Sequence, residues 1–257
     1  MSAAPNLLEV TGLTVRFGGL VALDGVDVVV AEGETVGVIG PNGSGKTTLF
    51  NALTGLYAPA GGEIVFRGRR LAGLEAHAIA RLGIARTFQA SRLCLALSVF
   101  DNILIGMHAG RRTGVVDFVV RRGRFLGEMR TAIERVSHLL ALFNGDLPRR
   151  GFERVGQLPQ IDRRRVEICR ALAAGPTLLL LDEPSEGLAP VVVQQIQKIL
   201  RGLKAEGMSM LLVEQNLHFA LSLADRHTLL VDGEVKETLT TAQVRARDRE
   251  LLDYLSV

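Results

Sequence analysis

The sequence predicts an α/β fold: a core with a mostly parallel sheet, an N-terminal antiparallel β-subdomain and an inserted helical subdomain. Three observations predict it. A glycine-rich run at residues 40–48 lies between a short apolar stretch and a helical one. An apolar run at residues 177–181 has the composition of a parallel strand buried on both faces. Predicted strands and helices alternate through the rest of the chain, as they do where helices cover a parallel sheet.

The N-terminal elements are predicted first. Residues 7–16 and 20–31 are apolar or alternate with polar residues, and Gly18-Gly19 between them predicts an antiparallel hairpin. A strand at 34–39 and a helix at 46–53 enclose the glycine-rich run. Further along we expect a strand at 63–66, a short helix at 75–82 and an extended segment at 83–88.

The middle of the chain predicts helices. From 99 to 143 apolar residues recur at spacings of three and four, and this block interrupts the strand-rich pattern. We therefore place an inserted helical subdomain at residues 90–160, within a single domain of residues 7–257. The remaining expected elements are helices at 162–174, 190–204 and 216–225, strands at 177–181 and 208–213, a hairpin at 228–236 and a short C-terminal helix.

Composition and charge limit the possible partners. The chain has 257 residues, of which 47% are hydrophobic, and its net charge is +3. Arginines crowd residues 111–130 and 149–170, a pattern typical of a nucleic-acid, membrane or protein contact but equally of a solvated helix face. Aromatic residues make up only 5%, which gives no platform for stacking bases, so we expect no nucleic-acid partner.

Cysteine use and hydropathy predict a soluble protein of a reducing compartment. Cys94 and Cys169 show no metal-ligand spacing and form no disulfide framework. The N-terminus has no basic start followed by an apolar run, so we expect no signal peptide. No apolar stretch approaches the ~20 residues of a membrane-spanning helix. Any membrane association should therefore go through a partner or the surface.

The glycine-rich run fits the G-x-x-x-x-G-K-[ST] phosphate-binding loop of a P-loop NTPase core. Its nucleotide-binding residues are Gly40, Pro41, Asn42, Gly43, Ser44, Gly45, Lys46, Thr47 and Thr48. The glycines let successive N–H groups point into one concavity, to which the helix start adds partial positive charge. Lys46 can then reach the β- and γ-phosphates, and the Thr47 hydroxyl can ligate Mg²⁺. We therefore expect ATP and Mg²⁺ as ligands.

Two carboxylates follow the apolar run at 177–181. Ligands of open α/β sheets bind at the carboxyl ends of the strands, where Asp182 and Glu183 emerge. We expect Asp182 to hold Mg²⁺ through its water shell, and Glu183 to act as the catalytic residue that poises a water for attack on the γ-phosphate.

These motifs, in this order, resemble the nucleotide-binding subunits of ATP-binding-cassette (ABC) transporters over almost the whole chain. The resemblance implies an ATPase that drives import at the cytoplasmic face of the membrane together with membrane permease subunits. It implies that Phe17 stacks on adenine, although an ordinary core phenylalanine is the alternative. It further implies that Gln89 contacts Mg²⁺ and that the helical block after it receives the membrane subunit.

Three features narrow the resemblance to the ATPases of branched-chain amino-acid importers: Phe17-Gly18-Gly19-Leu20, residues 83–89 and the long arginine-bearing insert. Those importers use two different ATPase subunits. The N-terminal half is similar to one of them, whereas the segments at 213–216 and 224–226 are more similar to the other. The related urea and amide importers stay open as alternatives.

The sequence departs from the family pattern at three places. The signature Leu-Ser-Gly-Gly-Gln is replaced by Leu158-Pro159-Gln160-Ile161-Asp162, so the serine hydroxyl and the glycines are absent. Asp162 either brings negative charge towards the opposite subunit's γ-phosphate or caps its own helix. Gln215, expected to be catalytic, replaces a histidine and can donate a hydrogen bond but carries no charge. Ala189 stands where the family usually has an aspartate.

These departures suggest which partner the chain needs. We expect a second ATPase subunit, as a homodimer or, in preference, a heterodimer whose other chain supplies a working signature. The alternative from another class is a weakly hydrolysing or non-hydrolysing regulatory subunit, against which the presence of Glu183 argues.

Overall fold

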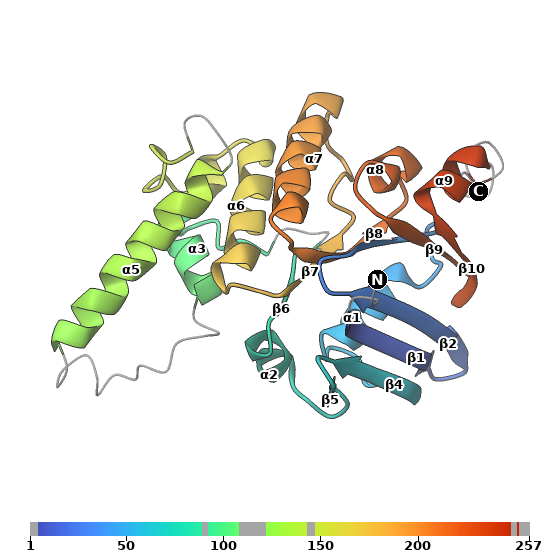
Figure 1. Ribbon diagram of the computed structural model, residues 1–257. Helices are drawn as coiled ribbons and strands as arrows, with labels where there is room; N and C mark the ends of the chain where they lie inside the picture. Colours follow the sequence, from blue (N-terminus) through green and yellow to red (C-terminus); the bar gives the residue numbers. More distant parts are fainter. Residues whose placement is uncertain (1–4, 89–91, 108–121, 143–146, 248–250, 252–257) are drawn as a thin grey trace. The chain divides into compact units, whose positions relative to one another are not determined.

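The computed structural model describes residues 5–88, 92–107, 122–142, 147–247 and 251 (Figure 1). It separates into two compact units. The first joins residues 1–89 to residues 177–257, and the second comprises residues 90–176. The limits of the expected helical subdomain, 90–160, stay a prediction.

The first unit contains an antiparallel sheet in the order β2-β1-β4-β5. Its strands are β1 (Asn6–Phe17), β2 (Leu20–Ala31), β4 (Gly61–Phe66) and β5 (Arg69–Arg70). β1 pairs antiparallel with both β2 and β4, and alternate residues of β1 such as Leu8 and Val10 are buried. The predicted N-terminal antiparallel β-subdomain is therefore confirmed.

The second sheet of this unit positions the site. Its order is β10-β9-β3-β8-β7-β6, and every pair of neighbours is parallel except β9 and β10. The strands are β3 (Thr35–Ile39), β6 (Ile84–Arg86), β7 (Leu178–Asp182), β8 (Ser209–Glu214), β9 (Arg226–Val231) and β10 (Glu234–Thr240). All residues of β3, β7 and β8 are buried, as expected of central parallel strands. Their register pairs Ile39 with Glu214 and Asp182 with Val213, so their carboxyl ends lie side by side.

The helices of the first unit are α1 (Lys46–Leu53), α2 (Ala76–Arg81), α7 (Pro190–Ala205), α8 (Leu217–Leu221) and α9 (Thr241–Ala246). The prediction of a helix at 216–225 is wrong in length. Beyond α8 the chain turns to bring Asp225 to the amino end of β3, where its carboxylate accepts the N–H of Thr35 at 3.0 Å.

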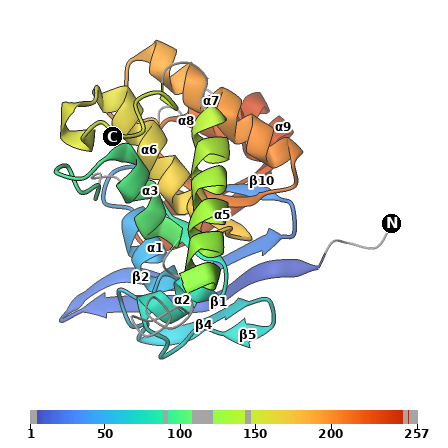
Figure 2. The same cartoon turned by 90° about the vertical axis from the view of Figure 1, so that its left-hand side faces the viewer.

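The second unit is helical. α3 (Val99–Gly106), α5 (Arg122–Ala141) and α6 (Gln160–Ala173) pack against one another (Figure 2). A 3₁₀ turn, η2 (Val155–Gln157), precedes α6. A Ser98–Asp101 capping box starts α3. Residues 108–121 of the expected helical block lie outside the described residues. Among the helices that the structure does describe, none combines the length and apolarity that a membrane span requires.

His227 on β9 is a buried histidine that should govern acid stability. Its Nε2 lies 3.1 Å from Thr241 Oγ1. Burial lowers its pKa from 6.5 to about 4, although the Asp225 charge opposes this. Between those values the unfolded chain binds more protons than the folded one, so stability falls as the pH falls. We expect a loss of about 2 kcal/mol in the free energy of unfolding between pH 7 and pH 5.

Urea unfolding at the two pH values measures this loss, which His227→Gln should largely remove. The matched control is His77→Gln at an exposed histidine on α2, which should keep the wild-type difference. An undiminished difference in the His227 variant would show that another group causes the acid sensitivity.

Candidate active site

The phosphate loop joins β3 to α1 and can be built only with glycine at three positions. Gly43 and Gly45 adopt left-handed φ values of 82° and 103°, which residues with a Cβ rarely reach. At Gly40 a Cβ would lie 2.1 Å from the Leu230 carbonyl oxygen on β9. The loop therefore packs closely against β9 at Gly40, and its backbone turns through left-handed conformations at Gly43 and Gly45.

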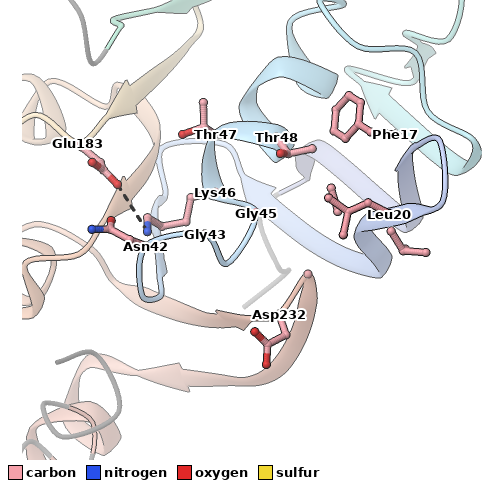
Figure 3. Close-up of a pocket in the computed structure, with 13 residues that line it drawn as sticks. Phe17, Leu20, Asn42, Gly43, Gly45, Lys46, Thr47, Thr48, Glu183 and Asp232 are labelled. Carbon is pink, nitrogen blue, oxygen red and sulfur yellow. Dashed lines mark ion pairs between the residues drawn. The ribbon is translucent and has the colours of Figure 1, made fainter. Parts of the chain in front are cut away.

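Lys46, the first residue of α1, folds back over this loop. Its side chain is buried, and Nζ donates to the carbonyl oxygens of Gly40 and Pro41, both at 2.8 Å. Nζ also lies 3.5 Å from Glu183 Oε1, the ion pair drawn in Figure 3. The ammonium group is thus held at a fixed point between the loop and the end of β7.

A cavity of about 600 Å³ opens over the loop. Residues from the antiparallel sheet, the loop, α1 and the ends of β7 and β9 line it: Phe17, Leu20, Val21, Ala22, Asn42, Gly43, Gly45, Lys46, Thr47, Thr48, Glu183, Asp232 and Gly233 (Figure 3). The Ser44 hydroxyl is buried nearby without a hydrogen-bond partner. A glycine cradle, a fixed ammonium group and free hydroxyls fit a phosphate-bearing ligand.

Glu183 stands directly after β7 in a strained backbone conformation. Its φ is 43°, in the left-handed region, and its N–H donates to the Val213 carbonyl on β8 at 3.0 Å. Burial raises the pKa of its carboxyl group, while the Lys46 charge opposes that rise. A carboxylate with a raised pKa is a better proton acceptor near neutral pH, as a general base requires.

Phe17 is not a core residue. It is 44% exposed, lines the cavity, and packs against the Tyr57 ring in a T-shaped arrangement at a centroid distance of 5.0 Å. The structure therefore removes the alternative of an ordinary core phenylalanine. Stacking on adenine stays a prediction.

Metal binding would have to rely on a small set of oxygens. Among the described residues, no group of three or more His, Cys, Asp or Glu side chains could hold a metal ion. The Thr47 hydroxyl and Asp182, with phosphate oxygens, are a set suited to Mg²⁺, which keeps several waters and takes few protein ligands. Gln89, the other expected ligand, lies outside the described residues.

Arg86 on β6 is a residue that the sequence reasoning did not assign to the site. Its guanidinium donates to Asp182 Oδ2 at 2.7 Å, and to Asn51 Oδ1 at 2.7 Å and Thr54 Oγ1 at 3.2 Å near the end of α1. The ring of Phe88 lies 4.9 Å from its central carbon. Arg86 therefore ties the expected metal-binding carboxylate to the helix that begins with Lys46. No local pattern in the sequence points to it, because its partner Asp182 lies 96 positions further along the chain.

The ends of β7 and β8 share a second cavity of about 300 Å³. Gln215 is exposed there and lines it with Glu183, Ser185, Glu186, Glu214 and Asn216. His218, one turn further along, instead lines a separate cavity with Arg201 and Arg245. The structure thus brings Gln215, and not His218, beside Glu183.

In the second unit, Asp162 does not cap its helix, which was one of the two roles expected of it. α6 begins two residues earlier than predicted, with Pro159 at its N-cap, so Asp162 lies within the first turn. Its carboxylate accepts hydrogen bonds from Arg150 at 2.9 Å and Arg165 at 3.0 Å. The negative charge that replaces the end of the signature is therefore compensated within this unit.

Comparison with known proteins gives consistent matches. Residues 23–186 match the protein family described as ABC transporter. The chain is 36% identical to the high-affinity branched-chain amino acid transport ATP-binding protein BraF of Pseudomonas aeruginosa, over 97% of each chain. It is 37% identical to BraG of the same organism, over 89% of this chain and 91% of that one. A crystal structure of the ADP conformation of an ATP-binding cassette superposes with a TM-score of 0.82 at 26% identity, over 98% of each chain.

The Arg86–Asp182 pair gives a stability prediction. Both side chains are nearly buried, at 4% and 2% exposure, so Arg86→Met leaves a carboxylate without its guanidinium in a site of low dielectric. We expect the free energy of unfolding to fall by about 3–5 kcal/mol. Arg247→Met, which breaks the half-exposed pair with Glu237, should cost less than about 1 kcal/mol. Urea unfolding measures both losses. If the two variants lose the same free energy of unfolding, the buried pair stabilises the fold no more than the partly exposed one.

Proposed function

Because the chain belongs to the ABC transporter family, we propose that it is the ATP-hydrolysing subunit of an importer for branched-chain amino acids. It is an ATPase of that family and has its α/β cassette fold. The observation that carries the proposal is the junction of Lys46 and Glu183 at 3.5 Å beside the phosphate loop. A phosphate-binding cation and a carboxylate suited to accept a proton meet there at the same cavity.

The residues divide the chemistry among themselves. Thr47, Asp182 and, by resemblance, Gln89 would hold Mg²⁺. When bound, the metal ion would neutralise charge on the phosphates. Lys46 and the loop N–H groups would stabilise the charge that develops on the leaving phosphate. Glu183 would orient a water for attack on the γ-phosphate and accept its proton. Gln215 would donate a hydrogen bond to an oxygen of that γ-phosphate.

The substrate class rests on relatives. BraF and BraG are both named as branched-chain amino acid transport ATP-binding proteins, and similarity to both along most of the chain supports the same class here. Urea and amide importers remain the alternative. Neighbouring genes for a second ATPase, two permeases and a periplasmic binding protein would support the importer.

The partners we propose are membrane permease subunits and a second, different ATPase, assembled peripherally at the cytoplasmic face of the membrane. The signature segment of the second unit favours a heterodimer. Pro159 lacks an N–H, and the Asp162 carboxylate is engaged by Arg150 and Arg165, so this chain's own signature segment is poorly suited to bind a γ-phosphate. A partner chain would therefore supply the signature for the loop at 40–48.

ATPase assays test both parts of the proposal. The purified chain alone should hydrolyse ATP slowly, and the assembled complex at least about tenfold faster, since closure over the nucleotide requires the partner's signature. Glu183→Gln in the complex should lower kcat by about 100-fold or more while ATP still binds. Glu206→Gln, at an exposed carboxylate just beyond α7, is the control and should leave kcat unchanged.

Two results would overturn the proposal. Fast turnover by the chain alone would exclude the need for a different partner. Unchanged hydrolysis in the Glu183→Gln complex would mean that this chain is a non-hydrolysing subunit and that the activity belongs to its partner.

A further inference from the structure

Glu214, the last residue of β8, joins the two loops that carry Glu183 and Gln215. Its Oε1 accepts the backbone N–H of Ser185 at 2.9 Å, and its Oε2 accepts that of Asn216 at 3.2 Å. We propose that Glu214 is a positioning residue that holds these two loops in register for hydrolysis. The inference rests on the proposed function, because it concerns the same site.

The sheet explains why this position can reach both loops. β7 and β8 are parallel neighbours, with Asp182 paired to Val213. β7 ends at Asp182, whereas β8 continues to Glu214, so the last side chain of β8 lies beside the turn that follows β7. That turn is closed by a bond from the Glu186 N–H to the Glu183 carbonyl at 3.1 Å. Ser185, the residue that Glu214 binds, lies inside this turn.

A carboxylate is the side chain that this arrangement requires. Two N–H donors arrive from two segments, and only Asp or Glu offers two acceptor oxygens in one planar group. Glu214 is 2% exposed, so water cannot readily replace a lost bond. Glutamine has the same shape but would present its NH₂ group to one of the two donors. It would therefore release either the Ser185 segment or the Asn216 segment.

The strained backbone of Glu183 makes the hydrogen bond from the Ser185 N–H to Glu214 important for the site. A non-glycine residue at φ 43° persists only where its surroundings fix it. The Glu183 N–H is held by Val213 on one side, and the residue two positions later is held by Glu214 on the other. Both anchors come from the end of β8. Loss of one should let the Glu183 carboxylate move away from Lys46 without dismantling the phosphate loop.

The experiment combines amide hydrogen exchange with kinetics on the full chain and its complex. In Glu214→Gln, exchange at Ser185, Asn216 or both should be at least about tenfold faster. In the complex kcat should fall about 10–100-fold, with the Kd for ATP within about twofold of wild type. A merely structural role would weaken ATP binding together with kcat.

The matched control is Glu34→Gln. Glu34 also accepts a backbone N–H, from Ala31 at 2.9 Å, but it lies just before β3, at the end of the sheet away from the site. This variant should change neither exchange in the two loops nor kcat. If Glu214→Gln fails to fold, Glu214→Asp serves instead, since it keeps the charge but is too short to span both donors.

The two arms separate failure of this inference from failure of the proposed function. Unchanged exchange at Ser185 and Asn216, or faster exchange with unchanged kcat, would overturn the positioning role while leaving the ATPase intact. Absence of hydrolysis in the wild-type complex would overturn the proposed function. In that case the positioning of the loops is still decided by the exchange data alone.

Discussion

The interaction on which the site depends is the attachment of Lys46 to its own phosphate loop. A flexible lysine ammonium group is held by two carbonyl oxygens of the loop, at Gly40 and Pro41, and faces a carboxylate from another strand. The loop thus orients the cation, and the cation ties the loop to the end of β7. The parallel sheet brings these groups together, because the carboxyl ends of β3, β8 and β7 lie side by side.

The sheet does this through adjacency rather than through long loops. β3 carries the phosphate loop, β8 lies beside it, and β7 follows. Residues just beyond these three strands therefore meet although they are far apart in the chain. Arg86 and Glu214 also connect neighbouring segments at this end of the sheet. Each links a strand end to an adjacent segment by buried charged hydrogen bonds. Such bonds are strong where water is excluded.

The phosphate loop, the fully buried β7 and the pair Asp182–Glu183 could be predicted because each is a local pattern of residue types. Arg86 could not, since its partner Asp182 is 96 positions away. One partner of Asp162 is equally hidden: Arg150 reaches it from outside α6, whereas Arg165 lies three residues along the same helix. A charge that looks repulsive in the sequence is therefore compensated. The end of α8 could not be predicted from local pattern, because the chain beyond it is held by a tertiary hydrogen bond from the Thr35 N–H to the Asp225 carboxylate.

The left-handed backbone at Glu183 has a consequence for protein engineering. Glycine would relax that conformation and would be accepted by the turn, but it has no carboxylate. A library selected for thermal tolerance alone should therefore accumulate glycine or asparagine at this position and lose turnover as it gains robustness. Engineering of this chain for thermal stability must keep Glu183 unchanged, because at this position stability favours glycine whereas hydrolysis requires the carboxylate.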